Sequence, residues 1–236
     1  MSKSGNKSAR YYPLFLTMDG RDCLVVGGGA VGERKIRTLL KYGARVRIVA
    51  RELSPWLAGK FSEDAVSWAG KEYREEHLEG ACLVFAATSD LVLNRAIAAD
   101  AHNRGIWCNM AADPELGSFI VPSVVERGPL SIAVSTSGLS PAIAKLLRQK
   151  LEREIGMEWE IFIKLLGALR DHFHSRNMKE KESLNIFSAL AALPVPEWLK
   201  EGNREKAFLK ISELCSPVIA ESELRSIWNR IWKPFS

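Results

Sequence analysis

The sequence predicts an α/β protein with a doubly wound parallel sheet, followed by a two-stranded segment and an all-α C-terminal region. Three observations support this fold class. Short apolar runs of strand length alternate with helical patterns in the first half of the chain, a glycine-rich turn joins the first strand to the first helix, and the last third shows only helical patterns. Strands alternating with helices are typical of parallel sheets that helices cover on both faces.

The first elements form a crossover unit. Cys23–Val26 is apolar on both faces, as expected of a buried parallel strand. A helix is predicted over Val31–Tyr42, with Gly43 where a helix C-cap is expected. The β-branched run Arg45–Ala50 reads as the next strand. Strand, glycine turn, helix and strand together predict a βαβ unit.

The alternation continues to about residue 117. Val66–Trp68 is a weak strand pattern, whereas Ala81–Ala87 and Ile106–Met110 are clearer ones. Thr88, Ser89 and Asp90 offer capping side chains ahead of a helix over Leu91–Arg104. In that helix we expect four residues to face the core: Val92, Ala96, Ile97 and Ala99.

The pattern changes after Pro114. Strands are predicted over Phe119–Val125 and Leu130–Ser135, and the short turn between them favours antiparallel pairing. A helix over Pro141–Ile155 follows, and Pro194 and Pro196 are expected to interrupt the helices after it. Those later helices are predicted over residues 158–176, 182–192, 204–214 and 221–232. We therefore divide the chain into residues 1–117, 118–155 and 156–236.

Composition narrows the function classes. The net charge of +5 suits an anionic small molecule, and the basic residues are too scattered to predict nucleic-acid binding. We see no signal peptide and no apolar run of membrane-spanning length. The four cysteines lack CxxC spacing and nearby histidines, which favours reduced thiols in the cytoplasm over a metal site or disulfides.

One motif carries chemistry. Residues 27–32 fit the GxGxxG pattern at Gly27, Gly29 and Gly32, directly after a buried strand and at the start of a helix. In a Rossmann-type fold these glycines allow a tight turn, close approach of the backbone to a pyrophosphate, and close helix–strand packing. The second strand lacks the usual acid at its end. Arg51 could bind the 2′-phosphate of NADP, or Glu52 could bind the ribose of NAD one position late, and either could be a solvated loop residue.

No nucleophile–base pair is apparent, because the four histidines are dispersed. No metal site is predicted either. The chemistry must then depend mainly on the cofactor, with the protein supplying orientation.

Several segments together resemble a known family. They are Val25–Lys35, Ala86–Asp90 with Asn94, Cys108–Asn109 ahead of Asp113–Pro114, Ser118–Ser123, and Ala133–Ala142 with Leu146–Arg148. Over about residues 11–155 the chain is similar to precorrin-2 dehydrogenases, including the dehydrogenase–ferrochelatase part of siroheme synthase. The C-terminal region after residue 155 resembles the family only in being helical.

The resemblance implies an NAD-dependent enzyme that oxidises precorrin-2 to sirohydrochlorin. It implies NAD binding through the glycine turn, with Ala30 and Val31, and through Arg51 and Glu52; we add Thr88 to this set. It also implies a homodimer joined through residues 118–155 and a tetrapyrrole substrate with eight carboxylates. Asn109, Asp113 and Thr136 are the candidates for catalysis.

The sequence departs from the family where some members handle metal. Ala112 stands where an aspartate is expected, Asp113 follows one residue later, and Thr136 replaces a serine. We therefore predict weak or absent ferrochelatase activity, which leaves room for a separate chelatase. The alternatives are a bifunctional enzyme, another NAD(P)-dependent reductase, or an NAD-sensing module without turnover. The Tyr-x-x-x-Lys pair of short-chain reductases is absent, which argues against a reductase of that kind.

Overall fold

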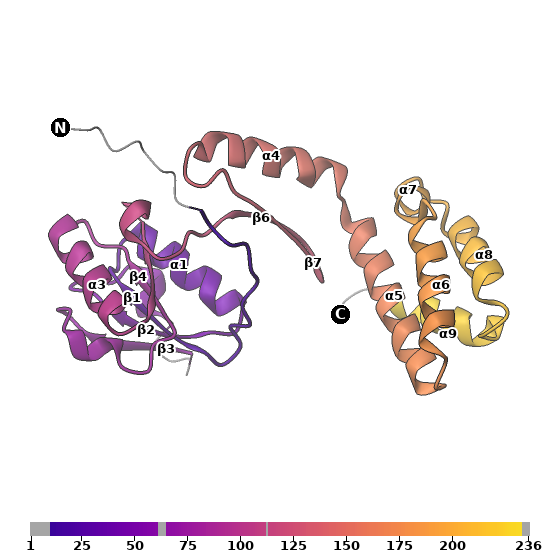
Figure 1. Cartoon of the computed structure of the whole chain (residues 1–236), viewed down its shortest axis with the longest axis horizontal. Helices are drawn as coiled ribbons and strands as arrows, with labels where there is room; N and C mark the ends of the chain where they lie inside the picture. The colour runs from indigo at the N-terminus through magenta and orange to yellow at the C-terminus, as the bar shows by residue number, and fades with distance from the viewer. Residues whose placement is uncertain (1–9, 61–64, 112, 233–236) are drawn as a thin grey trace. The chain divides into compact units, whose positions relative to one another are not determined.

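A computed structural model describes residues 10–60, 65–111 and 113–232. The chain forms two compact units (Figure 1). The first comprises the chain up to Val121 together with Thr136–Ser140, and the second comprises Pro122–Ser135 and the chain from Pro141 onward. The division into residues 1–117, 118–155 and 156–236 stays a prediction.

The first unit contains a five-stranded parallel sheet in the order β3-β2-β1-β4-β5. This order, with crossovers on both sides of β1, confirms the predicted doubly wound α/β fold. The strands are β1 (Asp22–Val26), β2 (Arg45–Val49), β3 (Val66–Gly70), β4 (Leu83–Ala86) and β5 (Trp107–Met110). The helices are α1 (Ala30–Lys41), α2 (Pro55–Ala58) and α3 (Leu91–Asn103), with 3-10 turns η1 (Glu75–Leu78) and η2 (Pro114–Leu116).

The sheet separates two apolar cores, one on each face. Val25 and Phe85 pack with Ile36 of α1 on one face. Ile97 of α3 packs with Val84 on the other. This arrangement follows from the strand sequences, because buried parallel strands need apolar side chains on both faces.

The buried face of α3 differs from the predicted one. Ile97 is buried as expected, but Val92 is 78% exposed and Ala96 and Ala99 are exposed too. The buried positions are Asn94, Ile97, Ala98 and Ala101. The prediction was wrong because it followed apolar residues alone, and a buried amide occupies one position of the true inner face.

The second unit begins with an antiparallel hairpin of β6 (Ser123–Arg127) and β7 (Leu130–Val134), followed by α4 (Pro141–Glu154). The antiparallel pairing is as predicted. The first strand starts at Ser123 rather than Phe119, and Pro122, which has no N–H to donate, precedes it. Upstream, the Ser118 N–H instead donates to the Cys108 carbonyl at 2.8 Å.

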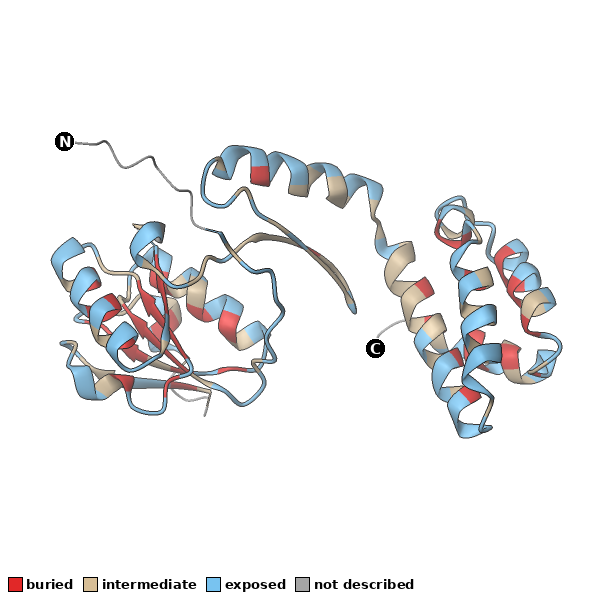
Figure 2. Cartoon of the chain, in the orientation of Figure 1, coloured by how far each residue is buried: buried red, intermediate tan, exposed pale blue. Residues whose placement is uncertain are grey.

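The rest of the second unit is a helical bundle around one apolar core that includes Phe173, Phe208 and Trp228 (Figure 2). Its helices are α5 (Met157–Ser175), α6 (Glu180–Ala191), α7 (Val195–Lys200), α8 (Arg204–Cys215) and α9 (Glu221–Ile231). The predicted break is confirmed at Pro194, which lies between α6 and α7, but Val195 and Pro196 already belong to α7. Pro196 lies in the first turn of α7, where a missing N–H costs no hydrogen bond. Within the described residues, no helix is long and apolar enough to span a membrane.

Candidate functional site

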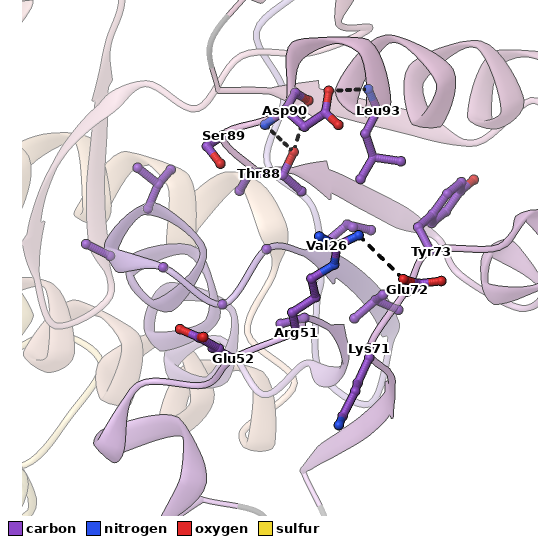
Figure 3. Close-up of a pocket in the computed structure, with 18 residues that line it drawn as sticks. Val26, Arg51, Glu52, Lys71, Glu72, Tyr73, Thr88, Ser89, Asp90 and Leu93 are labelled. Atoms are coloured by element: carbon purple, nitrogen blue, oxygen red, sulfur yellow. Dashed lines mark hydrogen bonds and ion pairs between the residues drawn. The ribbon is translucent and has the colours of Figure 1, made fainter.

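A pocket of about 730 Å³ lies at the carboxyl ends of β1, β2 and β4 (Figure 3). It adjoins the β1–β4 boundary, where successive connections leave β1 in opposite directions. Open α/β sheets bind ligands at such a switch point. The pocket is lined by Val26, Gly27, Gly28, Gly29, Ala30, Val31, Val49, Ala50, Arg51, Glu52, Lys71, Glu72, Tyr73, Ala87, Thr88, Ser89, Asp90 and Leu93.

Three positions of the glycine turn have no room for a side chain, and one of them is Gly28, whose Cβ would lie 2.2 Å from the Glu52 carbonyl oxygen. Gly27 has φ +122°, and a Cβ there would lie 2.4 Å from the Ala87 carbonyl oxygen. A Cβ on Gly32 would lie 1.9 Å from the Gly27 carbonyl oxygen. Gly27 therefore permits the turn, and Gly32 permits α1 to pack closely on the end of β1.

Gly29 differs from these three glycines. It is the N-cap of α1 in an extended conformation, and no described atom lies within 4 Å of the position its Cβ would take. No side chain caps this end of α1. The first N–H groups of a helix have no acceptor within the helix and carry the positive end of its dipole. The turn therefore offers an anion a set of N–H donors and a clear approach.

The rim of the pocket beyond β2 and β3 is charged. An Arg51 guanidinium nitrogen lies 3.4 Å from a Glu72 carboxylate oxygen, and both side chains are largely solvent-exposed. Figure 3 shows Arg51 turned toward Glu72, with Glu52 apart from this pair. An exposed pair of this length contributes little to stability, so Arg51 can change partner at little cost.

The loop after β4 is held by a buried amide. The Asn94 Oδ1 accepts from the Thr88 N–H at 3.2 Å and from its hydroxyl at 2.7 Å, and the Asn94 Nδ2 donates to the Thr88 carbonyl at 3.0 Å. The Asp90 carboxylate caps α3 by accepting from the N–H groups of Val92 and Leu93. These bonds fix the backbone of Thr88 at the pocket edge and engage its hydroxyl.

Tyr73 forms part of the pocket wall. Its hydroxyl donates to an Asp100 carboxylate oxygen at 3.1 Å. Burial and the hydrogen bond to Asp100 raise the pKa of the phenol, so the side chain stays neutral. Tyr73 thus presents the pocket with a fixed, uncharged ring.

The structure brings most of the predicted cofactor residues together. Seven of them line the pocket, namely Gly27, Gly29, Ala30, Val31, Arg51, Glu52 and Thr88, while Gly32 is buried beside it. Sequence reasoning missed Lys71, Glu72 and Tyr73, which follow β3. A signal was available, because the ends of parallel strands share one sheet edge, but the third strand was the weakest in the sequence.

The candidates for catalysis do not line this pocket. Asn109 is 5% exposed near the end of β5; its Nδ2 donates to the Phe119 carbonyl at 3.0 Å, and its Oδ1 is buried without a partner. Asp113 is half-buried just before η2. The Thr136 hydroxyl oxygen accepts from the Ser140 N–H at 3.0 Å. Ala112 lies outside the described residues.

Among the residues that the structure describes, no three His, Cys, Asp or Glu side chains gather in a group that could hold a metal ion. The four cysteines are free thiols, and burial raises the pKa of Cys108 and of Cys215 to about 11.

The chain is similar to known proteins of one family. A protein-family model described as putative NAD(P)-binding matches residues 14–123. A second family model, described as the central part of a sirohaem biosynthesis protein, matches residues 127–154. A siroheme synthase from Neisseria meningitidis serogroup B is 40% identical over 190 residues, which cover 76% of this chain and 39% of that protein. The siroheme synthase of Nitrosomonas europaea is 35% identical over 204 residues, or 86% of this chain and 43% of that protein.

The chain belongs to the siroheme synthase family, whose NAD(P)-binding and central parts it matches. It spans about two fifths of the length of the siroheme synthases that it matches. A solved structure named SirC, precorrin-2 dehydrogenase, shares the fold with a TM-score of 0.70 and 22% identity, covering 94% of this chain and 98% of that one. The shared fold therefore includes the helical C-terminal region, for which the sequence alone gave only a resemblance in character.

Proposed function

We propose that this chain catalyses the NAD-dependent oxidation of precorrin-2 to sirohydrochlorin. The observation that carries the proposal is the pocket at the β1–β4 switch point, with Gly29 open toward it and the N-terminus of α1 uncapped by any side chain. The pocket volume falls within the range usual for cofactor sites. Family membership supplies the substrate class, since the relatives are siroheme synthases and the structural neighbour is a precorrin-2 dehydrogenase.

Each part of the pocket would make a different contact with the bound dinucleotide. The N–H groups at the start of α1 would hold the pyrophosphate, and Glu52 would accept from a ribose hydroxyl. The Thr88 loop, fixed by Asn94, would support the dinucleotide on the β4 side. Bound NAD supplies the hydride acceptor that no side chain can provide. Asp113 or water would take the proton that precorrin-2 loses.

The test is anaerobic mixing of the protein with precorrin-2 and NAD. We expect absorbance at the NADH wavelength to rise together with conversion of the tetrapyrrole to sirohydrochlorin. Nucleotide binding without turnover would contradict the proposal and favour the sensor alternative. Turnover of a substrate other than precorrin-2 would favour another reductase.

We also propose that the cofactor is NAD rather than NADP. Glu52 and Glu72 place two carboxylates at the rim, where they would repel a 2′-phosphate, and Glu72 already pairs with Arg51. Glu72→Gln should therefore release Arg51 and lower the KM for NADP by about fivefold, with little change for NAD. Steady-state kinetics with both nucleotides check this. An unchanged ratio of the two KM values would show that Glu72 does not govern the choice.

We propose further that ferrochelatase activity is weak or absent. Ala112 stands in place of the expected aspartate, and the described residues hold no metal-binding group. Purified protein with sirohydrochlorin and ferrous or cobaltous ion should insert metal no faster than the spontaneous reaction. Insertion well above that rate would make the chain bifunctional. The first result would leave metal insertion to a separate chelatase or to the spontaneous reaction.

We propose a homodimer joined through residues 118–155. The helix α4 has one buried residue, Ala144, and exposes Ile143, Leu146 and Leu147 to about half their area. Such a helix in a monomer leaves apolar surface in water, which a second copy would cover. Sedimentation velocity should give twice the chain mass, and a monomer at high micromolar concentration would contradict this.

The four free thiols support a cytoplasmic location.

A further inference from the structure

Two thiols lie side by side at the amino ends of β1 and β4. The Sγ atoms of Cys23 and Cys82 are 4.0 Å apart, although 59 positions separate the two residues in the sequence. β1 and β4 are neighbours in the sheet, and Cys23 lies opposite Leu83 (Figure 1). The Cys82 N–H donates to the Asp22 carbonyl at 2.8 Å. Backbone pairing therefore holds the two cysteines together, however their side chains rotate.

The backbone spacing at this place suits a disulfide. Neighbouring strands lie about 4.8 Å apart and rise about 3.3 Å per residue, so residues one step apart on adjacent strands have Cα atoms about 6 Å apart. Disulfides join Cα atoms that are about 4.4–6.8 Å apart. To form the bond, the two sulfur atoms must approach by about 2 Å, which side-chain rotation supplies without moving the strands.

The two thiols differ in their access to solvent. Cys82 is exposed, whereas Cys23 is fully buried in the core that α1 covers. Burial, and after it the neighbouring Cys82, raise the pKa of the Cys23 thiol well above its usual range. A dissolved oxidant therefore reacts with Cys82 first, and Cys23 is the thiol beside it. Cys108 and Cys215 are both buried, so neither is open to such an oxidant.

We propose that peroxides oxidise Cys82 and that Cys23 then converts the product into a reversible disulfide. The Cys82 thiolate attacks one oxygen of hydrogen peroxide, the O–O bond breaks, and the other oxygen leaves as water after taking a proton. Cys82 is then a sulfenic acid. The Cys23 sulfur attacks the Cys82 sulfur, the S–O bond breaks, and the oxygen leaves as water with the Cys23 proton. The two thiols lose two electrons in all, and the peroxide gains them.

The bond would lie at the edge of the sheet away from the nucleotide pocket. Cys23 is the second residue of β1 and Cys82 precedes β4, whereas the pocket lies at the carboxyl ends of these strands. Oxidation should therefore spare nucleotide binding, and this site does not depend on the proposed function. A disulfide across this span restricts the unfolded chain, so it should stabilise the first unit. It also removes the sulfenic acid before irreversible oxidation.

The test is peroxide treatment of the reduced, folded chain, followed by peptide mapping. Free thiols should fall from four to two, with one link between the peptides that contain Cys23 and Cys82. Dithiothreitol should restore all four thiols by exchange. The oxidised protein should unfold at a temperature at least about 5 °C higher than the reduced protein. The Kd for NAD should be the same in the two forms.

Three variants separate the roles of the thiols. Cys82→Ser should keep its remaining thiols under the same peroxide treatment. Cys23→Ser should accumulate the sulfenic acid on Cys82, which dimedone traps, because no second thiol is there to remove it. Cys108→Ser is the matched control, since Cys108 is a buried thiol of the same sheet, and it should form the disulfide as the wild type does.

Peroxide that leaves all four thiols intact would overturn the proposal, as would a link from Cys82 to a second copy of the chain. Oxidation of Cys82 to the sulfinic acid while Cys23 stays reduced would overturn it too. These results come from the wild-type protein, so they hold even if Cys23→Ser, which changes a buried side chain, fails to fold. A disulfide that alters the Kd for NAD would contradict the separation of this site from the pocket.

Discussion

Replacing Gly29 with valine is expected to raise the Kd for NAD by about a hundredfold or more while the protein stays folded. Gly29 has ordinary extended backbone angles, and the space around its Cβ position is open, so valine causes no clash within the protein. The added methyl groups would stand in front of the first N–H groups of α1. A phosphate could then no longer reach those donors.

Isothermal calorimetry with NAD measures this effect, and thermal unfolding checks the fold. Gly167→Val is the matched control, because Gly167 is exposed in α5 and its Cβ position is also open. It should leave the Kd for NAD unchanged. Wild-type affinity in Gly29→Val would show that the nucleotide does not approach the turn at this residue.

Replacing Gly32 with alanine is expected to lower the stability of the fold, whereas Gly29→Val lowers only the affinity for NAD. Its Cβ would lie 1.9 Å from the Gly27 carbonyl oxygen and 2.9 Å from the carbonyl carbon, both backbone atoms. Relief requires α1 to move away from β1, which opens the core around Ile36. We expect the free energy of unfolding of the first unit to fall by about 3 kcal/mol, at the upper end for overpacking.

Urea unfolding followed by circular dichroism measures the loss in Gly32→Ala. NAD binding should fall as well, but only as a consequence of the displaced helix. The two glycine variants thus separate two roles, since Gly29→Val loses affinity without stability and Gly32→Ala loses both. A Gly32→Ala protein as stable as the wild type would contradict the close packing described here.

The sequence predicted the fold well where local patterns and packing agree. The runs at Cys23–Val26 and Ala81–Ala87 are apolar on both faces, as buried parallel strands require. The glycine spacing then located the first turn of the site. Sequence patterns failed to predict which residues are buried where tertiary contacts decide it. Asn94 is buried because it holds the Thr88 loop, and no hydropathy pattern predicts a buried amide.

The remaining errors also have physical causes. The break at Pro194 was predicted correctly, but it does not extend to Pro196, which occupies the first turn of α7, where proline is tolerated. Lys71–Tyr73 were not predicted to line the pocket, because the preceding strand is exposed at Ser67 and Trp68 and its apolar pattern is therefore weak. Asn109, Asp113 and Thr136 came from family resemblance, and their roles in catalysis stay predictions.

The proposed function depends above all on the binding of a nicotinamide dinucleotide at the turn between β1 and α1. Calorimetric titration of the wild-type protein with NAD tests it most directly. We expect one NAD per chain, with a Kd well below one millimolar and weaker binding of NADP. Absence of heat with either nucleotide at millimolar concentration, from a folded protein, would contradict the account.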